Sequence, residues 1–400
     1  MALSLAIDSV RPLFQPILWL DTLSIAGYES LARCAEGLPF AEPTDLLAAA
    51  RCAGRISELD ATMSRRSIEA LTDVDWHPTQ TLFGNVDAEA IISRPDPLTM
   101  DTLDRAAAAG LRVVVEITER SPLANPGALI EALTHVRSQG WGVAVDDVGA
   151  EEDSLALLAI LQPDVVKLDK SILHCPVDTH IARIRTVTRL YCDRTGALMV
   201  CEGVETQAHE ARARALGADL VQGVRYGAAE PLPIATGSVD QPVRLLGNDV
   251  REEATLAQRL SSIPEAALPA TQIIDAVSEL LAIAARSGRS AVVIATAPGI
   301  THIAADSLAH LAGALPYSAL VALFAPGCRT QPAAGVHGID ASMEEQLGSA
   351  WSLTVVAETL AVSILAGRRG ANLNDPVPHR IVHDHATVTQ ILRLLVANIR

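Results

Sequence analysis

Short apolar segments alternate with longer segments of helical spacing over the first 235 or so residues of this chain. The apolar segments are rich in Val, Ile and Leu, and they predict strands at residues 14–20, 25–30, 81–86, 112–117, 142–145, 165–168, 198–201 and 220–221. This alternation implies parallel strands covered by helices, so we expect an α/β fold of the closed, TIM-like (β/α)8 type. An open doubly wound sheet is the alternative, but no G-x-G-x-x-G sequence follows an early strand.

The length of 400 residues predicts more than one domain, and 49% hydrophobic residues against 20% charged ones are enough for large cores. Proline and glycine gather at residues 231–242 and mark a boundary. We expect a barrel over residues 1–237, a linker with a helix over 238–270, and a smaller α/β domain over 271–400. In the linker, Asn248 is expected to cap a helix that runs through Leu260.

The net charge of −16 argues against a partner made of DNA or RNA, because such a partner requires a basic surface. No stretch reaches the roughly 18–20 apolar residues that span a bilayer, and the N-terminus lacks the pattern of a signal peptide. The six cysteines form no C-x-x-C pair, which favours reduced thiols. We therefore expect a cytoplasmic protein without membrane insertion.

Polar side chains lie at the ends of most of the predicted strands in the first half. They are Glu29, Asn85, Glu116, Asp146, Asp147, Lys167, Glu202 and Gln222. One polar residue at the end of one strand is usually a solvated rim position or a helix cap. The recurrence at strand after strand is different, because the carboxyl ends of barrel strands meet on one face, where active sites lie.

Carboxylates that converge on one face repel each other strongly, and some take up protons unless a cation lies between them. The set offers oxygen ligands without His or Cys, which favours Mg²⁺ or Mn²⁺ over Zn²⁺. The adjacent Asp146 and Asp147 could serve two ions, and two ions can activate water and stabilise a leaving oxygen. The residue types therefore predict metal-assisted hydrolysis of a phosphate ester.

The same residues lie in an ordered series of short motifs that resembles the EAL family of cyclic-di-GMP phosphodiesterases. The matching pieces are Phe14-Gln15-Pro16-Ile17, Gly27-Tyr28-Glu29-Ser30-Leu31-Ala32-Arg33, Asn85, Glu116-Ile117-Thr118-Glu119, Asp146-Asp147-Val148-Gly149, Lys167-Leu168-Asp169, Glu202-Gly203-Val204-Glu205 and Gln222-Gly223. Each piece is short, but the series follows the family order across nearly all of residues 10–235.

The resemblance implies hydrolysis of cyclic-di-GMP to linear pGpG with two Mg²⁺ or Mn²⁺ ions, and a homodimer. It implies one metal at Glu29, Asn85, Glu116 and Asp146, and a second at Asp146 and Asp147 with Glu202 nearby. It further implies that Lys167 contacts the attacking water, with Glu29 and Glu202 as further catalytic groups. Substrate contacts would come from Gln15, Arg33 and Gln222, and Glu119 and Glu205 would brace the loop after Asp147.

Two departures from the family pattern bear on activity. The Glu-Ala-Leu triplet reads Glu29-Ser30-Leu31, which keeps the acid. The loop after the two aspartates carries Ala150-Glu151-Glu152-Asp153, where the family has a second glycine and no run of acids. Three acids beside an anionic substrate, and the lost freedom of the backbone, favour the alternative of a catalytically weak or inactive cyclic-di-GMP receptor.

Residues from about 270 to the C-terminus resemble a DICT domain, a sensory module found beside cyclic-di-GMP enzymes. The features that resemble it are residues 291–295, 308–311, 319–324, the strand from Trp351 and the sequence His383-Asp384-His385. On a strand, His383 and His385 would share a face and could bind a metal; the other interpretation is a polar turn before a helix. The resemblance implies regulation by a signal that the sequence does not name.

Overall fold

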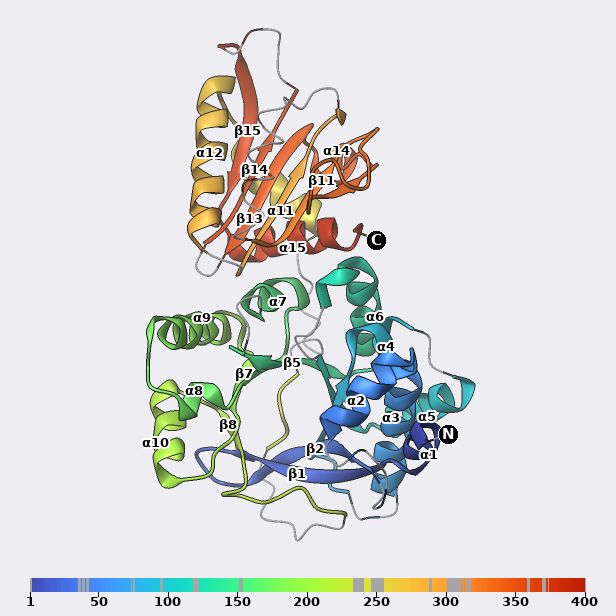
Figure 1. The fold of residues 1–400 in the computed structure, drawn as a ribbon. Helices are drawn as coiled ribbons and strands as arrows, with labels where there is room; N and C mark the ends of the chain where they lie inside the picture. Colours follow the sequence, from blue (N-terminus) through green and yellow to red (C-terminus); the bar gives the residue numbers. More distant parts are fainter. Residues whose placement is uncertain are drawn as a thin grey trace. The chain divides into compact units, whose positions relative to one another are not determined.

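The computed structural model describes residues 2–34, 37, 40, 43–72, 74, 76–93, 96–117, 122–150, 154–232, 241–245, 255–287, 290–300, 311, 313, 318–357, 360–368, 372 and 374–399. The chain divides into two compact units (Figure 1). The first comprises Met1–Pro122, Glu131–Glu151 and Gln162–Asp249, and the second comprises Leu123–Ile130, Glu152–Leu161 and Val250–Arg400.

A closed barrel of eight strands, joined in sequence order, forms the centre of the first unit and confirms the predicted TIM-like fold. The strands are β1 (Arg11–Trp19), β2 (Ile25–Arg33), β3 (Thr81–Val86), β4 (Arg112–Ile117), β5 (Gly142–Val148), β6 (Val165–Leu168), β7 (Leu198–Cys201) and β8 (Leu220–Gln222). Helix α1 precedes β1, and helices lie between the later strands. They are α1 (Ala2–Ser9), α2 (Pro43–Cys52), α3 (Ile56–Thr72), α4 (Ala88–Ile92), α5 (Pro97–Ala108), α6 (Pro126–Ser138), α7 (Ser154–Leu161), α8 (Ser171–His174), α9 (Thr179–Thr195) and α10 (Gln207–Leu216).

The expectation of parallel strands holds from β2 to β8 and fails for β1. Strand β1 is antiparallel to both of its neighbours, β2 and β8. Residues 20–24 are the whole connection between β1 and β2. A connection this short can close a hairpin but cannot cross back over the sheet as a helix does, so the second strand must reverse direction.

The amino end of the barrel is closed by an apolar plug. Val243 and Leu245 pack against inward side chains near the strand starts, among them Val114 and Val165. The indole nitrogen of Trp19 donates a hydrogen bond to the carbonyl of Gln241, at 3.1 Å, and so fixes the plug segment. Because apolar side chains fill this end, polar groups inside the barrel can gather only at the opposite, carboxyl end.

The second unit contains a mixed sheet of seven strands in the order β12-β11-β10-β13-β14-β15-β9. The strands are β9 (Ala266–Pro269), β10 (Ala291–Thr296), β11 (Ser318–Phe324), β12 (His337–Ile339), β13 (Trp351–Ala357), β14 (Leu360–Ala366) and β15 (Pro376–Val382). Strands β10, β11 and β12 pair in parallel, and the remaining pairs are antiparallel. The predicted strands at 291–295, 319–324 and 353–357 are confirmed, whereas residues 308–310 lie outside the described residues.

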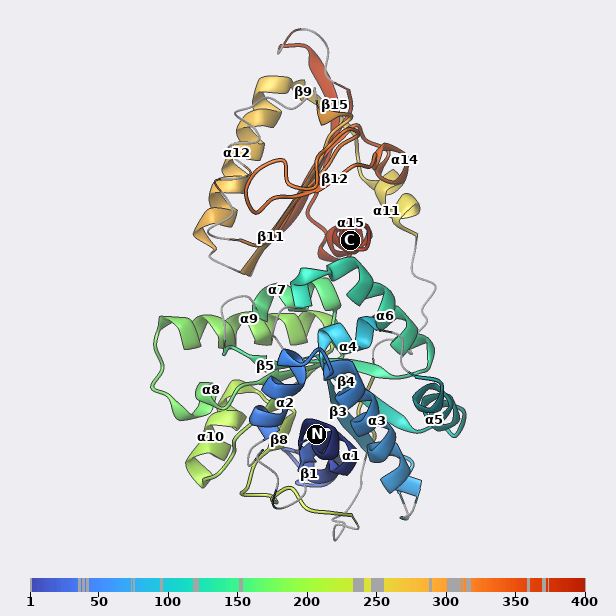
Figure 2. The same cartoon turned by 45° about the vertical axis from the view of Figure 1, so that its right-hand side comes forward.

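Helices cover both faces of this second sheet. Figure 2 shows α12 (Ala270–Arg286) on one face and α15 (His385–Val396) on the other. Every second residue of β10 and of β13 points to one face of the sheet, and these side chains, such as Val293 and Val355, share a core with α12. Asp384 caps α15 by accepting a hydrogen bond from the backbone of Thr387, at 2.9 Å, so the polar-turn interpretation of the segment from His383 is confirmed.

The linker helix begins later than predicted. Helix α11 runs over Leu256–Ser262, and Thr255 caps it in a capping box with Gln258. Asn248 lies outside the described residues. Thr255 is preferred because its hydroxyl and the Gln258 side chain satisfy two backbone N–H groups reciprocally. All six cysteines are free thiols, and no helix that the structure describes is long and apolar enough to cross a membrane.

A buried carboxyl group on α3 makes the stability of the barrel depend on pH. Asp60 is 8% exposed and accepts a hydrogen bond from the backbone of Asp87, at 2.7 Å. Burial raises its pKa to about 7. The folded protein therefore holds a proton that the unfolded chain releases near its ordinary pKa of about 4. The stability that this group contributes is fully present below the unfolded pKa of about 4 and is lost as the pH rises through the folded pKa of about 7.

We expect the free energy of unfolding to fall between pH 4 and pH 8 by up to about 4 kcal/mol because of Asp60. In Asp60→Asn the decrease should be smaller by that amount, since an amide does not titrate and can still accept from Asp87. Urea unfolding of both proteins across this pH range measures the difference. Parallel curves for the two proteins would contradict the assignment.

Candidate active site

Each of the eight strands contributes one inward polar side chain at the carboxyl end of the barrel. We call this set the polar ring; it consists of Gln15, Glu29, Asn85, Glu116, Asp146, Lys167, Glu202 and Gln222. Glu202 directly follows β7, and the other seven lie on their strands. The ring therefore brings together residues that are up to 207 positions apart, as the contact between Gln15 and Gln222 shows.

The ring follows from the strand period. On β4 the inward Val114 is followed two residues later by Glu116, and on β6 Val165 is followed by Lys167. Side chains two apart on a strand share a face, so on seven of the eight strands an apolar group near the plug lies two residues from the polar group at the rim. On β2 the position two residues before Glu29 is Gly27, which has no side chain. Strand β1 runs the other way, which is why its polar residue, Gln15, comes two residues before the inward Ile17.

Lys167 lies at the centre of the ring and is completely buried. Its ammonium nitrogen contacts four carboxylates. The partners are Glu202 Oε1 at 2.7 Å, Glu116 Oε1 at 2.9 Å, Asp146 Oδ1 at 3.0 Å and Glu29 Oε2 at 3.4 Å. One positive charge thus faces four acids in a region that excludes most water, which leaves an excess of negative charge for a further cation.

Glu29 is oriented by two amide side chains. Asn85 donates to its Oε1 and Gln222 donates to its Oε2, both at 2.6 Å. The Gln222 amide also reaches Gln15, at 3.2 Å, and Gln15 in turn donates to the carbonyl of Gly227, at 3.1 Å. This chain of hydrogen bonds fixes the side of the ring where the antiparallel strand β1 closes the barrel.

Adjacent aspartates reach the same site because β5 is irregular. The pairing of β5 with β6 shifts register between Val145 and Val148, and Asp147 has a φ of 55°. Successive side chains on a regular strand point to opposite faces, so this bulge is what turns both Asp146 and Asp147 toward the rim. A left-handed backbone is uncommon for a residue with a side chain and is found preferentially at functional sites.

Two groups of carboxylates result, and they share one residue. Glu29, Glu116 and Asp146 place oxygen atoms within 4.8 Å of one another, and so do Asp146, Asp147 and Glu202. Glu116 Oε2 is buried and receives no hydrogen bond in the described part of the chain. An orphaned buried carboxylate oxygen beside other carboxylates fits a divalent cation.

Burial and crowding shift the pKa values of these acids upward in the metal-free protein. Burial, followed by the charge of Glu29, raises the pKa of Glu116 well above its ordinary value. Burial likewise raises the pKa of Glu202 well above the ordinary range, despite Lys167. The pKa of Asp147 rises to about 6 through burial and the neighbouring Asp146.

Two members of the ring keep their charge. Burial would raise the pKa of Glu29, but Lys167 and the donated hydrogen bonds of Gln222 and Asn85 outweigh it and lower the pKa. Burial would lower the pKa of Lys167, but the surrounding carboxylates, Asp146 foremost, raise it well above its ordinary value. Lys167 is therefore a permanent cation and not a base.

The remaining predicted residues lie outside the ring. Arg33 ends β2, where its guanidinium donates to the carbonyl of Ala32 at 2.8 Å, and it lines a hollow of about 920 Å³ beside Asn85. A smaller hollow of about 280 Å³ is lined by ring residues and by Glu205, which is exposed. Glu119 and the acids at 151–153 lie outside the described residues.

Two histidines beside the ring were missed by the sequence analysis. His174 and His209 lie next to Glu205. The four-residue spacing between Glu205 and His209 at a predicted helix start was an available signal. His174 had no signal, because only the packing of α8 brings it to that place.

Relatives of this chain include proteins named for cyclic di-GMP hydrolysis. The probable cyclic di-GMP phosphodiesterase PdeB of Escherichia coli K12 is 28% identical over 225 residues, which are 54% of this chain and 42% of that protein. Cyclic di-GMP phosphodiesterase NbdA of Pseudomonas aeruginosa is 27% identical over 239 residues, 57% of this chain and 30% of that protein. The chain thus spans less than half the length of either relative.

A solved structure resembles the same region. The calcium and cyclic-di-GMP complex of Klebsiella pneumoniae BlrP1 shares 26% sequence identity with a TM-score of 0.47, over 56% of this chain and 57% of that chain. The sequence profile of the EAL domain matches residues 2–229, which include the whole polar ring. Since that match extends over more than half of the sequence, the chain belongs to the EAL domain family.

Proposed function

We propose that the protein is a phosphodiesterase that hydrolyses cyclic-di-GMP to linear pGpG with two Mg²⁺ or Mn²⁺ ions. The observation that carries the proposal is that the acids form two groups of three residues, and Asp146 belongs to both. Two groups with one common ligand suit two neighbouring cations, and the donor atoms are oxygens, which Mg²⁺ and Mn²⁺ prefer. The names of the two curated relatives support cyclic-di-GMP as the substrate.

Each ring residue has a role in this proposal. Glu29, Asn85, Glu116 and Asp146 would hold one ion, and Asp146, Asp147 and Glu202 the other. When bound, the ions would supply the positive charge that activates water and stabilises the leaving oxygen. Lys167, a fixed cation, would orient the attacking water through its ammonium group. Glu29 is held in position by the amides of Asn85 and Gln222. Gln15, Gln222 and Arg33 would contact the substrate.

Further parts of the proposal concern the whole chain. We place the phosphodiesterase within residues 1–237, a linker over 238–270 and a regulatory domain of DICT type over 271–400. The protein would act in the cytoplasm as a homodimer, with Glu119 and Glu205 bracing the loop after Asp147. The mixed sheet with helices on both faces supports a separate folded module in the C-terminal part.

A receptor without turnover is the second candidate. The observation that favours it is the acidic sequence Ala150-Glu151-Glu152-Asp153, which follows the two aspartates directly. Three negative charges this close to Asp147 in the sequence would repel an anionic substrate and so disfavour turnover.

Hydrolysis of cyclic-di-GMP with Mg²⁺ and with Mn²⁺, followed by the appearance of pGpG, tests the proposal. We expect turnover that EDTA abolishes and that falls by at least about a hundredfold in Glu29→Ala, because that variant loses a ligand of one ion. Asp101→Asn, which removes an exposed acid on α5, is the control and should keep full activity. Binding of cyclic-di-GMP without turnover would select the receptor instead.

A further inference from the structure

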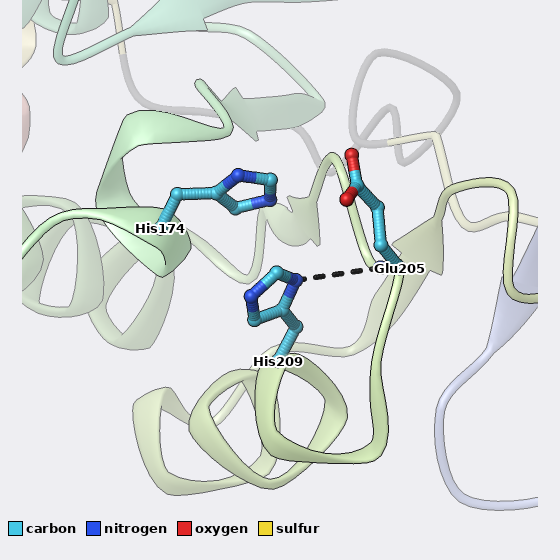
Figure 3. Close-up of side chains that lie close together, drawn as sticks. All are labelled: His174, Glu205 and His209. Carbon is cyan, nitrogen blue, oxygen red and sulfur yellow. Dashed lines mark hydrogen bonds between the residues drawn. The ribbon is translucent and has the colours of Figure 1, made fainter.

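A second group of metal-ligand side chains lies beside the polar ring and is not part of it. His174, Glu205 and His209 each offer one ligand atom, and these atoms lie within 4.8 Å of one another. Figure 3 shows the two imidazole rings and the Glu205 carboxylate turned toward one space, His174 from α8 and the other two from α10 and the loop that leads into it. The ring centroids of the two histidines are 4.2 Å apart.

The backbone around these residues holds the two rings in place. His174 is the last residue of α8, and its Nε2 lies 2.7 Å from the carbonyl oxygen of Gly203. Gly203 has a φ of 65°, and a Cβ there would lie 2.5 Å from the Cβ of Lys170, so only glycine permits this approach. This contact with the Gly203 carbonyl restricts the orientation of the His174 ring.

His209 is positioned by the start of α10. The Thr206 hydroxyl accepts a hydrogen bond from the backbone of His209, at 3.1 Å, and caps the helix. The Nδ1 atom of His209 is 3.4 Å from the backbone nitrogen of Glu205, a long and therefore weak hydrogen bond. A metal ion could replace that bond at little loss, and the Glu205 side chain is exposed.

We propose that His174, Glu205 and His209 form a site for Zn²⁺ or a neighbouring first-row transition metal, separate from the oxygen-only ring. Two imidazole nitrogens and one carboxylate are a common set of protein ligands for zinc, with water in the fourth position, whereas Mg²⁺ rarely takes imidazole. Tetrahedral zinc with bonds of about 2.0–2.1 Å holds its ligand atoms about 3.3 Å apart. Because the three ligand atoms lie within 4.8 Å of one another, side-chain rotation would have to shorten their separations by up to about 1.5 Å.

Such an ion would connect two loops at the carboxyl end of the barrel. His174 follows β6, the strand of Lys167, and Glu205 follows Glu202 by three residues. Bound zinc would therefore hold the segment that positions Glu202 against the segment that follows Lys167. The inference concerns metal binding alone and does not depend on the proposed hydrolysis.

Zinc binding measured against a chromophoric chelator, with Mg²⁺ in large excess, tests the site. The measurement uses the full chain carrying Asp146→Asn, which removes the ligand common to both carboxylate groups of the ring. We expect one equivalent of Zn²⁺ to bind, with affinity reduced at least about tenfold by His174→Asn and by His209→Asn. His135→Asn, an exposed histidine on α6 outside every such group among the described residues, is the matched control and should bind as before.

A second measurement uses the protein without substitutions in its histidines. Ring-nitrogen NMR of histidine-labelled protein should show Zn²⁺ shifting the signals of two histidines, and Mg²⁺ shifting neither. If the His174→Asn and His209→Asn variants bound zinc as tightly as the protein with both histidines, the proposal would be overturned. Unchanged ring signals on addition of zinc would do the same and would leave the two rings as a tilted aromatic pair.

Discussion

Replacing Lys167 by methionine is expected to slow hydrolysis severely and to destabilise the metal-free protein as well. The side chain is completely buried, and its ammonium group contacts four carboxylates at 2.7 to 3.4 Å. Methionine fills a similar volume but leaves these acids without a cation, which in buried clusters costs about 3–5 kcal/mol. We expect the rate to fall at least about a hundredfold to a thousandfold, since the fixed charge proposed to orient the attacking water is lost.

Urea unfolding without metal and pGpG formation with metal measure the two effects of Lys167→Met. Mg²⁺ should recover part of the stability, because it supplies positive charge to the same acids, but it should not recover the rate. Lys170→Met removes the exposed ammonium three residues later and should leave the free energy of unfolding unchanged. A Lys167→Met protein as stable as the parent would show that the acids are already protonated and need no cation.

Replacing Asp146 by asparagine should separate these two effects. Asp146 belongs to both carboxylate groups, so the variant loses a ligand of both proposed ions. The loss of several kcal/mol of transition-state stabilisation corresponds to a rate at least about a thousandfold lower. Stability without metal should be kept or increased, because burial raises the pKa of Asp146 and the amide oxygen can still accept from Lys167.

The stabilisation that Mg²⁺ produces is the most direct readout for Asp146→Asn. For a single site, an ion at a hundred times its dissociation constant stabilises the folded state by about 2.7 kcal/mol. Thermal unfolding with and without Mg²⁺ should show this gain in the parent and in Asp101→Asn, and little of it in Asp146→Asn. A full Mg²⁺ response in Asp146→Asn would place the ions elsewhere.

The ring was accessible to sequence analysis because two regularities coincide in it. Strand ends of a barrel converge, and side chains two apart share a face, so Glu116 and Lys167 could be assigned to one rim from their positions alone. Distances and charge states could not be assigned this way. Glu29 keeps a lowered pKa because of the charge of Lys167 and of amide donors from β3 and β8, and no local sequence pattern specifies these contacts.

The errors have physical causes as well. The direction of β1 depends on the short connection at residues 20–24, which contains no helix. The alternation of strands and helices assumes a helix between strands and so predicted the wrong direction. The linker helix was assigned to Asn248 by residue type, whereas the reciprocal bonds of Thr255 and Gln258 determine its start. His174 and His209 meet because Gly203 allows α8 to approach closely, a contact between loops that periodicity does not describe.

The left-handed backbone of Asp147 has an energetic cost. Glycine takes this conformation without strain, and it would remove a charge that lies beside Asp146 in a crowded site. Glycine at this position would therefore relieve backbone strain and charge repulsion, but it would remove a carboxylate from the group of Asp146, Asp147 and Glu202.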